Sequence, residues 1–319
     1  MTPKKAGVFF MVLAIALGAV QWVIAPAFYF LGLGINSLFL QSSIYGIMIV
    51  MFIIFILVSG ERPAEFLGFR KFKASAFFLT ILYSFLTYPA VTAVAMASNL
   101  LFSNPLTDLE EAFPLIATII FTFVCAPVFE ELAFRGVIFQ GMRKSGRVAA
   151  SIILSSLAFG LFHGNLTQFI YASLIGVFAA LLMEAGGSIW LTMLYHLIFN
   201  FLGSVVQPWF FLSIFNGGGE YSAEITESMS EPVSELASLL GFVVLVVVIA
   251  VIAGAGAIGL FLSAFVLKGI KKVQRGGSIY PERNSLRAEY SKGIINIPLI
   301  IGIVIYAAEI AVMLLVDSL

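Results

Sequence analysis

The sequence predicts an all-α, polytopic membrane protein with about nine transmembrane helices and its N-terminus in the cytoplasm. The first observation is composition: 61% of the 319 residues are hydrophobic and only 11% are charged, whereas soluble domains carry about 25% charged residues. The second is that the apolar residues gather into stretches close to the ~20 residues that a transmembrane helix needs. The third is an uneven distribution of charge between the loops that join these stretches.

The apolar stretches define the expected helices in chain order. They cover residues 7–32, 38–59, 75–102, 112–142, 148–164, 167–184, 188–214, 236–267 and 293–316. The fourth is long and is expected to tilt or protrude, whereas the fifth and sixth are short and only Gly164 and Asn165 separate them. We interpret 1–319 as a single transmembrane domain in which core helices over 112–202 are flanked by the helices of 1–111 and 236–316.

Basic residues fall on alternate loops of this map. Of the 17, all but Arg135 lie before the first stretch or between stretches two and three, four and five, or eight and nine: Lys4, Lys5, Arg62, Arg70, Lys71, Lys73, Arg143, Lys144, Arg147, Lys268, Lys271, Lys272, Arg275, Arg283, Arg287 and Lys292. The intervening loops carry acidic residues instead, at Asp108, Glu110, Glu111, Glu220, Glu224, Glu227, Glu231 and Glu235. The positive-inside rule therefore places the N-terminus in the cytoplasm and the C-terminus outside.

Composition also excludes several classes of partner and site. The formal net charge is zero, so no bulk charge favours a nucleic-acid partner, and the lipid bilayer is the predicted environment. A single cysteine, Cys125, excludes an internal disulfide and a cysteine-ligated zinc site. The apolar run from Gly7 to Leu33 exceeds the core of a cleavable signal, so the first helix is expected to target and anchor the chain. Without a C-terminal Cys-a-a-X sequence, the chain is not expected to be a prenylation substrate itself.

Charged residues inside the fourth apolar stretch form the first candidate motif, Glu130-Glu131-x-x-x-Arg135. A charged group at membrane depth costs roughly 2.5–3.5 kcal/mol on insertion scales, so such groups usually serve a function. Glu131 and Arg135 share a helix face at i,i+4 and can neutralise each other. Glu130 points elsewhere without a local partner, which suits a general base. Pro127 removes a helical hydrogen bond just before the pair and could open the helix there.

The only two histidines, His163 and His196, also lie in apolar stretches. His196 and Asn200 share one helix face at i,i+4, and Phe159 shares a face with His163. At about 1.5 Å per residue, Glu130 and Asn200 lie about 18 Å from the basic ends of their helices, His196 about 12 Å and His163 about 22 Å. These depths allow all four groups to converge on one site. There, one pair could activate water while the other stabilises an oxyanion.

Each of these residues also has a structural explanation. A Glu–Arg pair in a membrane helix can serve packing or register, a lone histidine can be a hydrogen-bonded core residue, and Asn200 alone could bridge helices. Glu130 is the hardest to explain in this way, because its neighbour already pairs with the arginine. Glu309, alone in the last stretch, is interpreted as a protonated core carboxyl or a group near the external interface, and not as catalytic.

Taken together and in this order, Glu130-Glu131-x-x-x-Arg135, Phe159-x-x-x-His163 and His196-x-x-x-Asn200 resemble the three motifs of the CPBP family of CAAX-processing and bacteriocin-processing intramembrane proteases, formerly called Abi, and are similar to those of type II CAAX prenyl endopeptidases. The resemblance covers about residues 112–202. It implies that Glu130 is the general base, that His163 helps to bind and activate water, and that His196 and Asn200 form the oxyanion hole.

The same resemblance implies supporting roles for Glu131, Arg135 and Phe159, which would hold the site together or orient substrate. The family is also described as metalloproteases, so Glu130, His163 and His196 are candidate ligands of a divalent metal, and such donors suit zinc. A glutamate-and-histidine site without a metal is equally consistent with the sequence, and we favour it slightly.

The sequence thus predicts a multi-pass intramembrane endopeptidase of a prokaryotic plasma membrane. Its substrate would be a membrane-associated or lipidated peptide or protein, as in CAAX-type, pheromone or bacteriocin processing. The main alternative is a non-catalytic bacteriocin self-immunity or membrane scaffold protein that retains the pocket. A proton- or ion-coupled transporter is a third class, but the chain shows no matching pair of interrupted helices of the kind that transporter repeats contain. The sequence does not specify an oligomeric state.

Overall fold

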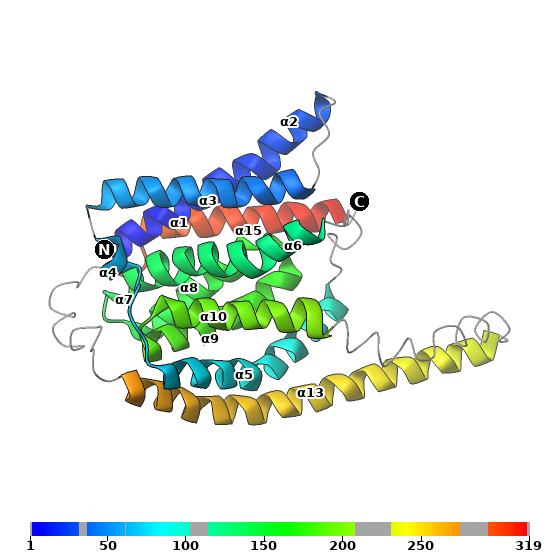
Figure 1. Ribbon diagram of the computed structural model, residues 1–319. Helices are drawn as coiled ribbons and strands as arrows, with labels where there is room; N and C mark the ends of the chain where they lie inside the picture. Colours follow the sequence, from blue (N-terminus) through cyan, green and yellow to red (C-terminus); the bar gives the residue numbers. More distant parts are fainter. Residues whose placement is uncertain are drawn as a thin grey trace.

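The computed structural model describes residues 2–31, 37–60, 62–102, 114–207, 231–274 and 293–317. All regular structure in these ranges is helical, which confirms the all-α, polytopic class. The helices run roughly side by side and form an elongated bundle (Figure 1). The acidic loops at 103–113 and 208–230, and most of the basic loop at 275–292, lie outside the described residues.

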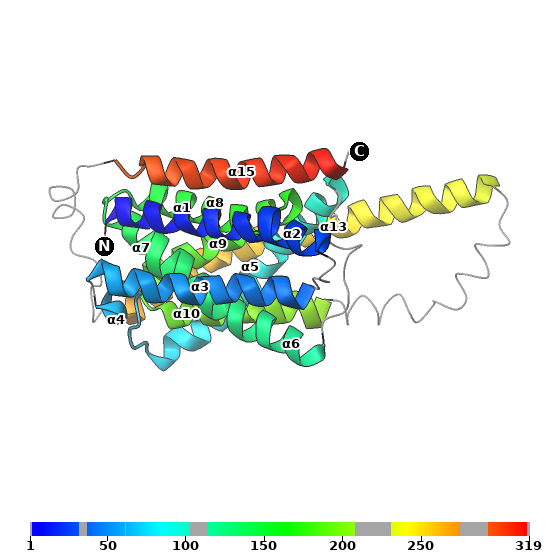
Figure 2. The ribbon, with the colours of Figure 1, turned by 90° about the horizontal axis from the view of Figure 1, so that it is seen from above.

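Three helices line one side of the bundle (Figure 1). They are α1 (Pro3–Ala19), which continues through the π-helical segment η1 (Val20–Ile24) into α2 (Ala25–Phe30), α3 (Ser37–Ser59) and α15 (Ile297–Asp317). Figure 2 shows α15 running beside α1. Phe10, Leu13, Met48 and Tyr306 from these helices are buried in one core cluster with Phe134 and its neighbours from the helix that carries the glutamate pair.

The opposite side of the bundle is built from α5 (Ala74–Leu101) and α13 (Glu231–Gln274), and α13 extends well beyond the other helices at its N-terminal end (Figure 1). Close packing depends on two glycines, because a Cβ at Gly256 would meet the backbone of Ala90 and one at Gly259 would overlap the carbonyl of Leu86. These two glycines therefore let two long helices approach closely.

Between these two sides lie the helices that carry the three motifs (Figure 1). In chain order they are α6 (Leu115–Ile120), η3 (Phe121–Glu130), η4 (Leu132–Phe139), α7 (Gln140–Arg143), α8 (Val148–Phe162), α9 (Leu166–Gly186), α10 (Ile189–Phe201) and η5 (Leu202–Val206). The short α4 (Pro63–Phe66) precedes α5. Both ends of α9 are capped. The Asn165 side chain accepts from the N–H of Gln168 at 2.8 Å, and Gly187 ends the helix in the left-handed region at φ 66°.

Eight of the described helices are long and apolar enough to cross a membrane. The ninth expected helix, at 148–164, is α8, an apolar helix of only 15 residues. It ends at Phe162, and Gly164 turns the chain back at φ 73°. At about 1.5 Å per residue α8 is about 22 Å long, shorter than the ~30 Å hydrocarbon core. The count of nine spans stays a prediction. The least supported of the nine is α8, the helix that ends beside His163.

The described segments that carry basic residues gather at one end of the bundle, although they are far apart in sequence (Figure 1). Lys5 Nζ donates to the Ser59 carbonyl at 3.1 Å, the Ser188 hydroxyl donates to the Arg70 carbonyl at 2.6 Å, and the N–H of Lys73 donates to Gln274 at 3.2 Å. Arg143 forms a bidentate pair with Glu184 at 2.7 and 2.8 Å. These contacts bring together the segments that the sequence assigns to one side of the membrane. The identity of that side stays a prediction.

Candidate active site

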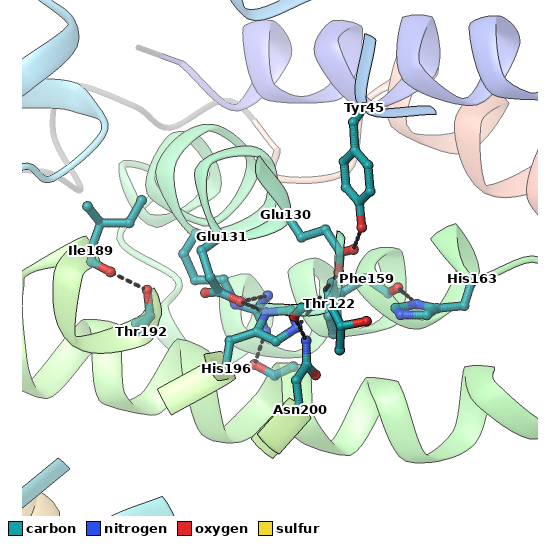
Figure 3. A network of polar contacts seen from close by, with 12 residues as sticks. Tyr45, Thr122, Glu130, Glu131, Phe159, His163, Ile189, Thr192, His196 and Asn200 are labelled. Atoms are coloured by element: carbon teal, nitrogen blue, oxygen red, sulfur yellow. Dashed lines mark hydrogen bonds and ion pairs between the residues drawn. The ribbon is translucent and has the colours of Figure 1, made fainter. Parts of the chain in front are cut away.

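The segment that carries Glu130 is a π-helix, Phe121–Glu130, and it contains Pro127. In a π-helix each N–H bonds the carbonyl five residues earlier, so the partner of the Thr122 carbonyl would be the N–H of residue 127. Proline has no N–H. Asn200 supplies the missing donor, since its Nδ2 lies 2.8 Å from the Thr122 oxygen (Figure 3). The proline predicted to open the helix thus leaves a carbonyl that anchors the asparagine of the third motif.

Glu131 is the centre of a buried charge network (Figure 3). Its Oε1 accepts from Arg135 Nη1 at 2.9 Å and lies 3.0 Å from His196 Nδ1. Arg135 also donates to the Gly176 carbonyl at 3.3 Å, and its guanidinium carbon lies 4.4 Å from the centre of the Phe159 ring. Glu131 is 0% and Arg135 1% exposed. Glu131 therefore neutralises the arginine and, because a carboxylate accepts, holds the proton of His196 on Nδ1.

Glu130 faces away from this pair, as helix geometry requires. Its Oε1 accepts from the Tyr45 hydroxyl at 3.4 Å, and its Oε2 lies 4.0 Å from His196 Nε2. The residue is 7% exposed. Its carboxylate is therefore the less firmly held of the two, and one imidazole edge lies beside it (Figure 3).

His163 follows the last residue of α8 and is oriented by its own helix. Its Nδ1 lies 2.9 Å from the Phe159 carbonyl, so Nδ1 carries the proton and the neutral ring keeps an unshared pair on Nε2. The Phe159 ring packs edge-to-face against both imidazoles, with centroids 5.0 Å from His163 and 5.9 Å from His196. Phe159 thus separates the two histidines and also covers the guanidinium of Arg135.

Glu130, His163, His196 and Asn200 all line one cavity of about 320 Å³, together with Tyr45, Thr122 and Phe159. The structure therefore brings the principal residues of the three motifs to one cavity that is partly open to its surroundings. Glu131 and Arg135 are not among the lining residues, and Glu131 contacts the lining residue His196. A second cavity, of about 460 Å³, also reaches Glu130 and His163.

Three polar residues that line both cavities were not identified from the sequence: Tyr45, Gln41 and Gln168. Tyr45 comes from α3, outside the range that resembles the family, and its ring stacks on Phe121 at 5.6 Å. The sequence contained a signal for two of these residues, because Gln41 and Tyr45 lie at i,i+4 in a strongly apolar stretch. Polar pairs at that spacing in a membrane helix mark a face that does not contact lipid.

The candidate metal ligands Glu130, His163 and His196 are not gathered as a metal site would need. Within the described ranges, no three His, Cys, Asp or Glu side chains form a group that could hold a metal ion. The donor set as arranged does not fit a metal, and we derive no chemical step through one.

This fold and this cavity define a class: a polytopic helical membrane protein whose core holds a carboxylate, two imidazoles and a carboxamide around one cavity. Residues 112–202 match the family described as "Type II CAAX prenyl endopeptidase Rce1-like". The match confirms the resemblance to the CPBP family and falls on the range that carries the three motifs.

The chain is also similar to a curated protein. The chain is 28% identical over 105 residues to the Bacillus subtilis (strain 168) protein named "Putative membrane peptidase YdiL". The aligned region is 33% of this chain and 42% of that protein, so it spans less than half of the relative. No solved structure matches the chain.

Proposed function

We propose that this protein is an intramembrane endopeptidase that hydrolyses a membrane-associated or lipidated peptide with water activated by Glu130. The observation that carries the proposal is the meeting of Glu130, His163, His196 and Asn200 at one cavity. The family match and the similarity to a protein named as a membrane peptidase support it.

The attack on the peptide bond uses Glu130 and His163. A water between them gives one proton to the Glu130 carboxylate and donates its other hydrogen to the free Nε2 of His163. The oxygen bonds to the carbonyl carbon, and the electron pair of the C=O bond moves to the carbonyl oxygen. Glu130 then passes its proton to the leaving nitrogen as the C–N bond breaks, which restores the carboxylate.

The oxyanion is held by His196 and Asn200. Asn200 has two hydrogens on Nδ2, and the Thr122 carbonyl takes one. His196 has a carboxylate beside each nitrogen, at 3.0 Å and 4.0 Å. An imidazole ring that is protonated on both nitrogens donates from both. Nε2–H and the second amide hydrogen are then the two donors that a developing oxyanion needs.

Replacing Glu130 tests the proposal directly. Glu130→Gln keeps the shape and removes the base, so turnover of quenched-fluorescent lipidated peptides should fall by about 10²–10⁴-fold. The matched control is Glu65→Gln, because Glu65 is exposed and forms an ion pair with the exposed Arg62. Thermal unfolding should be similar for all three proteins.

The same variant also separates an enzyme from a non-catalytic protein in cells. Comparison of secreted and membrane-associated peptides between cells with wild-type protein and cells with Glu130→Gln should show precursors that accumulate only with the variant. A self-immunity or scaffold role would instead be indicated if the variant cleaved nothing, left the peptide profile unchanged and still complemented a deletion.

A further inference from the structure

Glu309, on α15, is a buried carboxyl for which the mechanism has no use. It is 6% exposed, and its Oε1 has no hydrogen-bond partner among the described residues. The hydroxyl of Tyr306, one turn earlier on the same helix and 1% exposed, is likewise without a partner there. Two unsatisfied oxygens one helical turn apart in a membrane core are costly, so a partner that the described residues do not supply is expected.

Both residues line the larger cavity, which Glu130 and His163 also line. Glu309 is 12 residues from the start of α15 at Ile297, so it lies about 18 Å along that helix, the depth at which Glu130 lies in its own helix. The two carboxyl groups therefore lie at similar depth on different sides of one space. The remaining wall comes mainly from apolar side chains of α1, η1, α3 and α15, among them Leu17, Val20, Ile44 and Met313.

The neighbouring helix is shaped to admit the carboxyl group. A Cβ at Gly18 of α1 would overlap Oε1 of Glu309. Glycine weakens a helix interior, so its presence at this contact is explained by the room that the carboxyl needs. The subsite is thus built from two helices that pack side by side, α1 and α15 (Figure 2).

We propose that this larger cavity, of about 460 Å³, binds a lysine or arginine side chain of the substrate near the scissile bond, with its cationic end on Glu309 and the Tyr306 hydroxyl. The inference rests on the proposed peptidase function and adds a specificity determinant to it. Long basic side chains combine an apolar stem with a charged tip. The stem would lie along Leu17, Ile44 and Met313, and the tip would pair with a carboxyl group whose Oε1 has no hydrogen-bond partner among the described residues.

The test compares paired quenched-fluorescent lipidated peptides that differ only in lysine or norleucine, at each of the three positions on either side of the cleaved bond. Wild-type protein should cleave the lysine peptide about tenfold more efficiently in kcat/KM at one of these positions. Glu309→Gln should remove that preference, because it should lower kcat/KM for the lysine peptide much more than for the norleucine peptide. Tyr306→Phe should reduce the preference in part.

A second variant covers the case in which Glu309→Gln does not fold. Gly18→Ala adds a Cβ that displaces the carboxyl group without changing its charge, and it should weaken the same preference. If wild-type protein cleaves peptides but shows no lysine preference at any position, the inference is overturned and the peptidase function stands. If the Glu309 and Gly18 variants lose kcat/KM equally for both peptides, the inference is also overturned, because an equal loss would show that Glu309 has a structural role.

Binding separates this inference from the peptidase function. In the Glu130→Gln background, which should not turn over substrate, the lysine peptide should bind about tenfold more tightly than the norleucine peptide. Adding Glu309→Gln should abolish the difference. If no peptide is cleaved by wild-type protein but this binding difference is found, the proposed function fails and the cationic subsite stands; equal binding of both peptides overturns the subsite.

Discussion

At the scale of single residues, the two adjacent glutamates have different surroundings. Glu131 accepts hydrogen bonds from a guanidinium and an imidazole and is fully buried, whereas Glu130 meets a tyrosine at 3.4 Å and an imidazole edge at 4.0 Å. A helix places neighbouring side chains about 100° apart, so one glutamate can maintain the network while the other faces the cavity.

The same substitution at these two positions should therefore have different effects. Glu131→Gln leaves Arg135 without its buried counter-charge and should lower the free energy of unfolding by about 3–5 kcal/mol. Glu130→Gln should change stability by less than about 1 kcal/mol, because that carboxylate has no comparable partner. Denaturation of both variants in the same detergent checks this. Equal loss of stability at both positions would contradict the assignment of the network to Glu131.

The sequence anticipated the pairing of Glu131 with Arg135, because i,i+4 geometry is local. It did not anticipate that His196 completes the same network or that Tyr45 reaches Glu130. Both contacts join residues that are 65 or more positions apart. Helix periodicity gives the face on which a residue lies but not which distant helix it meets.

At the scale of elements, the first motif lies on a helix with irregular hydrogen bonding. The sequence identified Pro127 as a place where a hydrogen bond is missing. It could not show that the carbonyl left free belongs to Thr122, since that depends on a π-helical rather than an α-helical repeat. The structure links Pro127 to the third motif through Asn200.

A double-mutant cycle tests this link. Asn200→Ala alone should destabilise the protein by about 1–3 kcal/mol, because it leaves the buried Thr122 carbonyl without a donor. In a Pro127→Ala background a backbone N–H can reach that carbonyl, so the cost of Asn200→Ala should fall by about 1 kcal/mol. Unfolding measurements on the four proteins give the coupling. Strict additivity would contradict the explanation of Asn200 as the substitute for the missing N–H.

Helix α8 shows what hydropathy alone could not resolve. Apolar composition predicted a span at 148–164, and the helix forms but stops after 15 residues. Its end is set by Gly164 at positive φ and by the Asn165 cap, both of which mark a turn and neither of which reports depth. The early end places His163 beside the cavity rather than at the far end of the bundle.

At the scale of the whole molecule, charge distribution and architecture agree. The described segments that carry basic residues meet at one end of the bundle, and hydrogen bonds join them in pairs (Figure 1). Loop charge predicted this grouping because the positive-inside rule needs only the order of the helices. The elongated α13 and the cavity beside α15 were not predicted, because both depend on how the helices pack.

Topology can be tested with cysteine labelling in a Cys125→Ala background. The exposed Lys71, at the basic end, and Glu224, in an acidic loop, are replaced by cysteine one at a time. A membrane-impermeant maleimide should label Glu224→Cys in intact cells but Lys71→Cys only after permeabilisation, because basic loops stay in the cytoplasm. The reverse pattern would place the N-terminus outside and overturn the predicted orientation.

The most direct test of the central claim follows the oxygen of water into the product. Purified protein is incubated with a cleavable lipidated peptide in ¹⁸O-enriched water, and the fragments are analysed by mass spectrometry under single-turnover conditions. Hydrolysis by Glu130-activated water predicts one ¹⁸O atom in the newly formed carboxyl group, and no labelled fragment with Glu130→Gln. Labelled product formed at the wild-type rate by Glu130→Gln, or cleavage without incorporation of ¹⁸O, would contradict the account.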